Sequence, residues 1–230
     1  MENIQKKLIQ IKATIANAEN KYGRAAGSVL LVAVSKGQPI EKIKTAIIQR
    51  QIHFGESYLQ EALIKIKELE GLDIIWHYIG RIQSKKAKLI AQNFSWIETV
   101  TSYKVAELLD KHRPANLPPL NVCIQINLSN EINKGGVLRE EILPLAKKIS
   151  QLPRLKLRGL MAIPNHFKEF DKQLKSFDEI CAEFKKLQNQ GFDIDTLSIG
   201  MSNDLEAAIA AGATTIRIGT DMFGKRTNNN

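Results

Sequence analysis

The sequence contains few cysteines and few aromatic residues, and it has no long apolar run. Only Cys123 and Cys181 occur in 230 residues, which is too few for a disulfide framework and favours a reducing cytoplasm. We expect both thiols to be buried and unreactive, because they fall in an expected strand and an expected helix. No segment approaches the roughly 18 apolar residues of a membrane span, and the amphipathic segment 1–12 lacks a signal-peptide core. The sequence therefore predicts a cytoplasmic protein that does not cross a membrane.

Metal-binding and nucleic-acid-binding patterns are also missing. No histidine, cysteine and carboxylate residues have the spacing of a metal site, and neither cysteine lies in a nucleophile motif. The net charge of +9 is spread singly over expected helical surfaces, except in the dense basic segment 81–88. No aromatic residues alternate with these basic residues as in an RNA-binding module. We interpret segment 81–88 as a solvated helical face or an anion-attracting rim, and we expect no nucleic-acid partner.

Short apolar runs alternate with amphipathic helical patterns along the whole chain. Helical patterns separate successive runs, and no linker is long enough to divide the chain into domains. We therefore expect one domain over residues 1–230, with an N-terminal helix over about 2–22 and a disordered tail over about 227–230. Eight repeats in about 200 residues predict an α/β fold, a single (β/α)8 TIM barrel with an extra N-terminal helix. A doubly wound open sheet is the alternative, but this chain would be large for one. The expected strands are 29–34, 52–54, 74–79, 96–100, 120–126, 155–161, 196–199 and 215–218.

Lys36 stands where the first expected strand ends. It follows the apolar run 29–34 and is separated from it only by Ser35. Such a run is typical of a strand that is buried on both faces. Low-dielectric surroundings disfavour the ammonium form of a lysine, and the neutral amine attacks a carbonyl to form a Schiff base. The alternative is that Lys36 only ends the strand and extends its amine into water.

The seventh expected strand ends in a turn that suits an anion. In segment 198–204, Gly200 permits a sharp turn and Ser202 is placed to cap the following helix. Free N–H groups at the start of that helix attract an anion, and the helix dipole adds to this attraction. Helix capping alone also explains Ser202.

A second turn of this kind follows the eighth expected strand. Gly219 permits close backbone approach, Thr220 offers a hydroxyl and an N–H group, and Arg217 offers a cation. The loops after strands seven and eight commonly form the phosphate site of a (β/α)8 barrel. The two turns together predict a phosphate cradle.

A Schiff-base lysine that faces a phosphate cradle across a barrel mouth suits two kinds of protein. Pyridoxal 5′-phosphate requires the amine for its aldehyde and the anion site for its phosphate. An aldolase that acts on a phosphorylated sugar would use the same two elements. His53, His77 and Met161 lie in or at the end of expected strands, where they are either pocket residues or ordinary core residues.

Ordered motifs along residues 7–226 are similar to those of the YggS/PROSC family, the pyridoxal phosphate homeostasis proteins. Together these matches are too many and too well ordered to arise by chance. The matching segments are 31–36, 54–56 with Gln60 and Glu61, 76–80 with Gln83 and Lys86, 118–122, 158–163, 197–202 with Asp204, and 217–220 with Phe223 and Gly224.

This resemblance implies a fold-type III barrel, like the barrel domain of alanine racemase, with pyridoxal 5′-phosphate bound to Lys36 as a Schiff base. It also implies phosphate contacts and a pocket wall. The implied phosphate-binding residues are Ser202, Arg217, Gly219 and Thr220, and the implied pocket residues are Met161, His77 and Ser198.

Three positions depart from the pattern of the family. Ser57 stands where asparagine is usual, and its shorter side chain cannot offer the same amide. Lys85 also replaces an asparagine and adds positive charge near the mouth, while Gly37 stands where threonine is common. None of these departures falls on Lys36 or on the phosphate cradle.

Two functions follow from the resemblance. One is a carrier that holds pyridoxal 5′-phosphate, takes part in vitamin B6 homeostasis and passes the cofactor to dependent apo-enzymes. The other is an amino-acid racemase. Racemases of this fold type add a β-domain after the barrel, and the partner subunit supplies an opposing acid or base, whereas this sequence stops a few residues after the eighth strand. We therefore expect a monomeric carrier without catalytic residues and without a metal.

Overall fold

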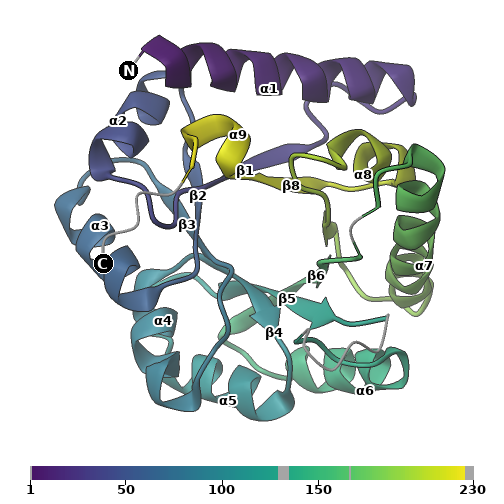
Figure 1. Cartoon of the computed structure of the whole chain (residues 1–230). Coiled ribbons are helices and arrows are strands. Elements are labelled where there is room, and N and C mark those ends of the chain that lie inside the picture. Colours follow the sequence, from purple (N-terminus) through teal and green to yellow (C-terminus); the bar gives the residue numbers. More distant parts are fainter. Residues whose placement is uncertain (1, 129–134, 166, 226–230) are drawn as a thin grey trace.

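The eight strands form a closed parallel barrel in which each strand pairs with its neighbours in chain order (Figure 1). This is a computed structural model, and it describes residues 2–128, 135–165 and 167–225. Pairing of the first strand with the last, from Leu30 opposite Thr215 to Ala33 opposite Ile218, closes the barrel. The strands are β1 Leu30–Val34, β2 His53–Glu56, β3 Ile75–Tyr78, β4 Trp96–Val100, β5 Leu120–Ile126, β6 Leu155–Ala162, β7 Thr196–Ser198 and β8 Thr215–Ile218.

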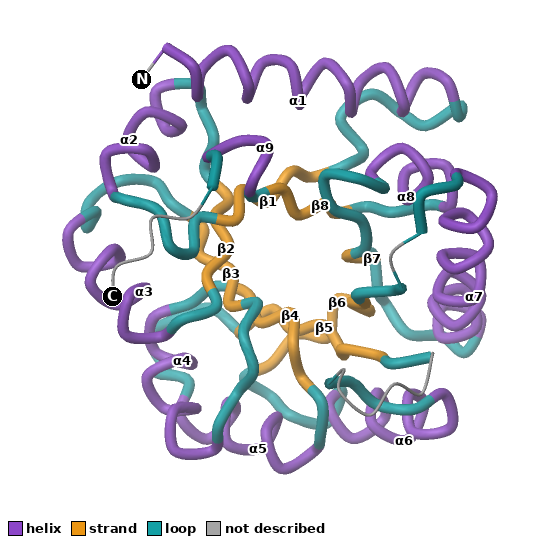
Figure 2. The backbone as a smooth tube through the Cα atoms, viewed as in Figure 1, coloured by secondary structure: helices purple, strands orange, loops and turns teal. Residues whose placement is uncertain are grey.

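The helices form a ring outside the strands (Figure 2). The predicted barrel and its N-terminal helix are confirmed, whereas two short helices, η1 and α9, were not predicted. The expected disordered tail over 227–230 lies outside the described residues. The helices are α1 Glu2–Lys21, α2 Ile40–Ile48, α3 Leu59–Glu68, η1 Ser84–Lys86, α4 Ala87–Asn93, α5 Tyr103–His112, α6 Arg139–Ile149, α7 Phe170–Asn189, α8 Leu205–Ala211 and α9 Thr220–Phe223.

Helix α1 completes the ring at the place where a helix after β8 would lie. It packs against α2 and α8, on either side of that place, and the helix that does follow β8 is only the four-residue α9 (Figure 1). Ile4, Leu8, Ile11 and Ile15 recur at helical spacing and are all buried. The N-terminal segment is therefore an integral part of the barrel wall.

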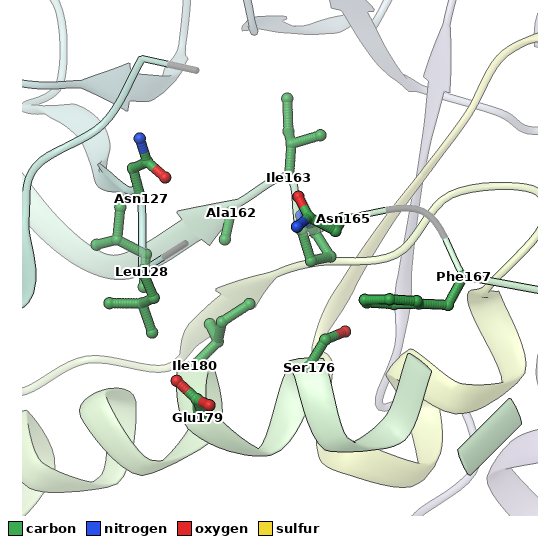
Figure 3. A pocket seen from close by; sticks show the side chains of 11 residues that line it. Asn127, Leu128, Ala162, Ile163, Asn165, Phe167, Ser176, Glu179 and Ile180 are labelled. Carbon is green, nitrogen blue, oxygen red and sulfur yellow. The ribbon is translucent and has the colours of Figure 1, made fainter. Parts of the chain in front are cut away.

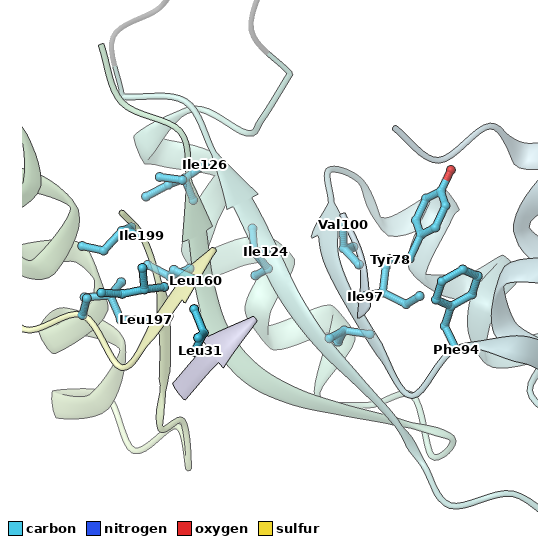
Figure 4. Close-up of a cluster of buried hydrophobic side chains, with 14 of the residues drawn as sticks. Leu31, Tyr78, Phe94, Ile97, Val100, Ile124, Ile126, Leu160, Leu197 and Ile199 are labelled. Carbon is cyan, nitrogen blue, oxygen red and sulfur yellow. The ribbon is translucent and has the colours of Figure 1, made fainter. Parts of the chain in front are cut away.

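The apolar runs of the strands build the core, as their burial on both faces requires. Leu31, Val32 and Ala33 of β1 are all buried, and so are both cysteines. Figure 4 shows how side chains from several strands, such as Ile124 and Leu160, gather in one apolar cluster. None of the described helices combines the length and the apolar character that crossing a membrane requires.

A bulge in β6 depends on a glycine. The pairing of β5 with β6 shifts register between Val122 and Cys123, because Cys123 lies opposite Gly159 and skips Arg158. Gly159 has a φ of 151°, and a Cβ atom there would lie 1.8 Å from the carbonyl oxygen of Thr196. Only glycine therefore lets β7 pair with β6 at this point.

We predict that Gly159→Ala lowers the free energy of unfolding by at least about 3 kcal/mol, because the new methyl group meets backbone that cannot yield. Gly71→Ala is the matched control: its φ is also positive, at 85°, but no atom lies within 4 Å of the added Cβ. The control is expected to cost about 1 kcal/mol. Urea unfolding of the two variants measures the difference, and equal losses would contradict the steric account.

Candidate functional site

A cavity of about 480 Å³ opens at the carboxyl ends of the strands, where barrels of this fold carry their sites. Residues at or just after the ends of β1, β6, β7 and β8 line it. It brings together six of the eight residues predicted for the site, while His77 and Ser198 are not among its lining. The six are Lys36, Met161, Ser202, Arg217, Gly219 and Thr220.

A smaller cavity of about 190 Å³ borders the first one at Ile163 (Figure 3). It lies between the ends of β5 and β6 and helix α7, from which Ser176 and Ile180 point toward it. Its described lining is mostly apolar and includes none of the predicted site residues. The larger cavity is therefore the candidate site.

Lys36 lies two residues beyond the end of β1, and its side chain is only partly exposed. Its Nζ donates a hydrogen bond to Oγ of Ser57, over 3.3 Å. Ser57 directly follows β2, and Gly55 of that strand pairs with Val34, so adjacent strands hold the two side chains together. Ser57, one of the three positions that depart from the family pattern, is thus in contact with Lys36, the candidate nucleophile.

The turn after β7 differs from the sequence prediction. Helix α8 begins at Leu205 with Asp204 as its N-cap, and Oδ1 of Asp204 accepts from the N–H of Met201 over 2.6 Å. Ser202 therefore does not cap the helix, because the turn extends two residues further than we expected. Gly200 is required here: its φ is 95°, and a Cβ would lie 2.5 Å from Cβ of Ala208 in α8.

The turn after β8 packs closely against the end of β1. A Cβ at Gly219 would lie 3.3 Å from the carbonyl oxygen of Val34 and 3.4 Å from its Cβ, a tighter approach than most side chains make. Thr220 is the first residue of α9. This packing places the second predicted turn beside the strand that leads to Lys36.

The two turns offer a set of donors that suits a phosphate group. Within the described residues, no acceptor takes the backbone N–H groups of Ser202, Asn203, Thr220 and Asp221, and all four residues line the cavity. Two of them, Ser202 and Thr220, also carry hydroxyl groups. Backbone N–H groups that converge on one hollow bind anions. These residues therefore fit the phosphate of a ligand in the cavity.

A chain of polar side chains lies inside the barrel, beneath the cavity. Oε1 of Glu98 is 2.7 Å from Nδ1 of His77, and its Oε2 accepts from Oγ of Ser198 over 2.7 Å. Nη1 of Arg217 donates to the same Ser198 Oγ over 2.6 Å, and its Nη2 donates to the carbonyl oxygen of Ala162 over 3.0 Å. His77 and Ser198 are therefore linked to the cavity through Glu98 and Arg217, because Arg217 lines the cavity and the other three side chains do not.

Glu98 is ionised at the centre of this chain. Burial alone would raise its pKa, but the hydrogen bond and charge of His77, the charge of Arg217 and the hydrogen bond of Ser198 together hold that pKa below its ordinary value. A carboxylate only accepts hydrogen bonds, so Nδ1 of His77 carries a proton. Nε2 of His77 lies 3.0 Å from Nδ1 of His53, and the two atoms share one further proton.

Sequence reasoning did not single out Glu98 as part of the site. It belongs to no motif, and its partners His77 and Ser198 come from strands far apart in the chain. One signal was available: a carboxylate within the otherwise apolar run 96–100 requires a buried partner.

The fold and the cavity define a class that includes the barrel domain of alanine racemase. The family model described as "Alanine racemase, N-terminal domain" matches residues 9–227. Alanine racemase of Clostridium difficile shares the fold, with a TM-score of 0.75 at 16% identity; the match covers 100% of this chain and 58% of that one.

Relatives with higher identity define the family more narrowly. The chain is 44% identical to the pyridoxal phosphate homeostasis protein of Vibrio cholerae, over 98% of both chains, and 44% identical to that of Escherichia coli K12, with the same coverage. PipY of Synechococcus elongatus, solved with pyridoxal 5′-phosphate bound, has a TM-score of 0.84 at 32% identity, over 96% of this chain and 100% of that one. The chain belongs to the YggS/PROSC family of pyridoxal phosphate homeostasis proteins.

We predict that His53 makes stability fall in acid. Burial and the neighbouring charge of His77 lower the pKa of His53 from 6.5 to about 4. Between these two values the unfolded chain binds a proton that the folded chain does not, so the free energy of unfolding falls as the pH drops from about 6.5 to about 4. This group contributes about 2 kcal/mol of that loss, because solvent screens the half-buried ring.

Urea unfolding at pH 7 and pH 4 of the wild type and of His53→Gln tests this prediction. Glutamine keeps a hydrogen-bond partner for His77 but does not titrate, and the groups that lie away from position 53 contribute equally to both proteins. The wild type is expected to lose about 2 kcal/mol more than the variant. Equal losses would show that His53 is not the group responsible.

Proposed function

We propose that this protein binds pyridoxal 5′-phosphate, with Lys36 as the Schiff-base residue and the two turns as the phosphate cradle. One observation carries the proposal: Lys36 and the four residues whose N–H groups have no acceptor in the described part of the chain all line one cavity. When bound, the cofactor supplies an aldehyde. Lys36 would hold the cofactor through its amine, because an amine condenses with an aldehyde to form a C=N bond and releases the aldehyde oxygen as water.

The relatives support this cofactor. Homologues that are 44% identical over nearly the whole chain are named for pyridoxal phosphate homeostasis, and PipY contains the cofactor. The residues alone left an aldolase open, and these relatives favour pyridoxal 5′-phosphate over a phosphorylated sugar.

Each site residue then has a role in holding the cofactor. Ser202 and Thr220 donate hydroxyl and N–H groups to the phosphate, and Gly219 keeps that turn clear of a side chain. Arg217 adds positive charge to the cradle, and the Glu98 network fixes its guanidinium through Ser198. Met161 forms part of the apolar wall, and His77 and Ser198 support the pocket from below.

We further propose that the cofactor is held and released rather than used for turnover. A racemase needs a second acid or base positioned across the cofactor from the lysine. The described lining of the cavity contains no histidine, tyrosine or cysteine, and Lys36 is its only lysine. A carrier fits this lining better than a racemase, and we propose that it is cytoplasmic and monomeric and supplies dependent apo-enzymes.

The Schiff base predicts a spectrum that depends on Lys36. Wild-type protein mixed with pyridoxal 5′-phosphate is expected to turn yellow, and borohydride should fix the cofactor to the chain. Lys36→Ala should lose both properties, because its side chain has no amine. Lys85→Ala, which removes an exposed lysine outside the cavity, is the control and should behave like the wild type. Unchanged absorbance and trapping in Lys36→Ala would overturn the assignment.

The carrier function predicts that amino acids are not turned over. Holo-protein incubated with L-alanine or other L-amino acids should produce D-isomer no faster than the same concentration of free pyridoxal 5′-phosphate, because the described lining offers no histidine, tyrosine, cysteine or second lysine to oppose Lys36. Chiral chromatography of timed samples measures this rate. A rate well above that of the free cofactor would favour the racemase.

A further inference from the structure

Three charged side chains lie behind the turn that carries Lys36. Glu56 ends β2, and Glu61 and Lys65 lie one turn apart on α3. Nζ of Lys65 is 2.7 Å from Oε1 of Glu56 and 2.5 Å from Oε1 of Glu61. The Glu56 and Lys65 side chains are 0% and 4% exposed, and that of Glu61 is 29% exposed. None of the three lines the cavity, so none is a contact for the proposed cofactor.

This cluster binds the chain on both sides of Lys36. Nζ of Lys65 donates to the carbonyl oxygen of Ser35 over 2.7 Å, and the Ser35 hydroxyl donates to Oε1 of Glu56 over 2.6 Å. On the other side, the N–H of Gly37 donates to Oε1 of Glu61 over 2.7 Å. The residues before and after Lys36 are therefore tied to the same ammonium-centred cluster.

Burying this cluster costs folding stability. Two charged groups are removed from water, and Oε2 of Glu56 has no hydrogen-bond partner among the described residues although it is buried. Burial, which outweighs the charge of Lys65, raises the pKa of Glu56. Apolar side chains of similar volume would fill the same space at lower cost. An arrangement that costs stability beside a reactive group indicates a constraint that function imposes.

We propose that Glu56, Glu61 and Lys65 are positioning residues that hold the main chain at Lys36 so that its amine is presented to the aldehyde of the cofactor. The inference rests on the proposed function and deepens it. The phosphate cradle belongs to other strands, so the cluster acts on formation of the Schiff base and not on binding of the phosphate. Its loss should therefore reduce affinity only for a ligand that has an aldehyde.

Two ligands separate an effect on Schiff-base formation from an effect on phosphate binding. Pyridoxal 5′-phosphate forms the Schiff base, whereas pyridoxine 5′-phosphate has the same ring and phosphate but an alcohol in place of the aldehyde. The test variant is Glu61→Leu, which removes the acceptor of the Gly37 N–H and leaves Lys65 paired with Glu56. Glu61 is partly exposed, so this change is less disruptive than a change at Lys65. The control is Glu68→Leu, which removes an exposed carboxylate from the same helix.

We expect Glu61→Leu to weaken binding of pyridoxal 5′-phosphate at least tenfold and binding of pyridoxine 5′-phosphate less than twofold, with a matching loss of absorbance from the Schiff base. Glu68→Leu should change neither affinity. Glu61→Gln, whose amide oxygen still accepts from Gly37, should restore most of the lost affinity and provides a variant of nearly the same shape as the wild type.

Other outcomes would overturn the inference. If Glu61→Leu keeps the wild-type ratio of the two affinities, whether both are unchanged or both are reduced, the cluster is only structural. If Glu61→Gln loses as much as Glu61→Leu, the hydrogen bond to Gly37 is not the cause. If the wild type itself forms no Schiff base on Lys36, the proposed function fails and the inference fails with it. If the wild type forms the Schiff base and Glu61→Leu binds both ligands as the wild type does, only the inference fails.

Discussion

Pairing of β1 with β8 is the constraint on which the candidate site depends. The two strands come from opposite ends of the described chain, and Leu30–Ala33 pair with Thr215–Ile218. Because both strands are parallel, their carboxyl ends emerge at the same rim. Lys36 follows one strand and the Gly219–Thr220 turn follows the other, so barrel closure brings the amine and the proposed anion-binding turn together. At this rim Gly219 packs closely against Val34, where a Cβ atom would lie 3.3 Å from the carbonyl oxygen.

The barrel interior adds a second level of organisation. Glu98 on β4 and Ser198 on β7 are bonded although these strands are not neighbours in the sheet, so their contact crosses the interior. Arg217 joins them from β8 and also lines the cavity. The buried carboxylate of Glu98 thus lies beneath the cavity, and the guanidinium of Arg217 lies between this carboxylate and the proposed phosphate cradle. The polar interior is therefore part of the site and not a defect in the core.

The sequence was sufficient for the fold because its signals were local. Each apolar run became a strand within a few residues, and counting the runs was enough to predict closure. Lys36 and the two glycine turns were also predictable, since each stands at a strand end. The cofactor came from the family resemblance, because the residues alone left an aldolase open.

What sequence reasoning missed depends on contacts between distant segments. Helix α8 is capped by Asp204 and not by Ser202, because the turn before it is two residues longer than we expected. Glu61 and Lys65 have the spacing of an ordinary helical ion pair. Their contacts with Ser35 and Gly37, on which the proposed role rests, join a different strand end to α3, and no local pattern records that placement.

Helix α1 has a consequence for how the molecule is made. It fills the gap in the ring between α2 and α8. The edge of β1 that does not pair with β2 pairs with β8, the last strand of the chain. In a chain emerging from a ribosome, one edge of β1 can pair with β2 early, but the other edge has no partner until β8, the last strand, has been made. Closure is a late, long-range event of the kind that folds slowly and exposes strand edges to other chains. Pairing of β8 with β1 also places Gly219 and Thr220 at the cavity, so closing this barrel and completing the cavity are one structural step.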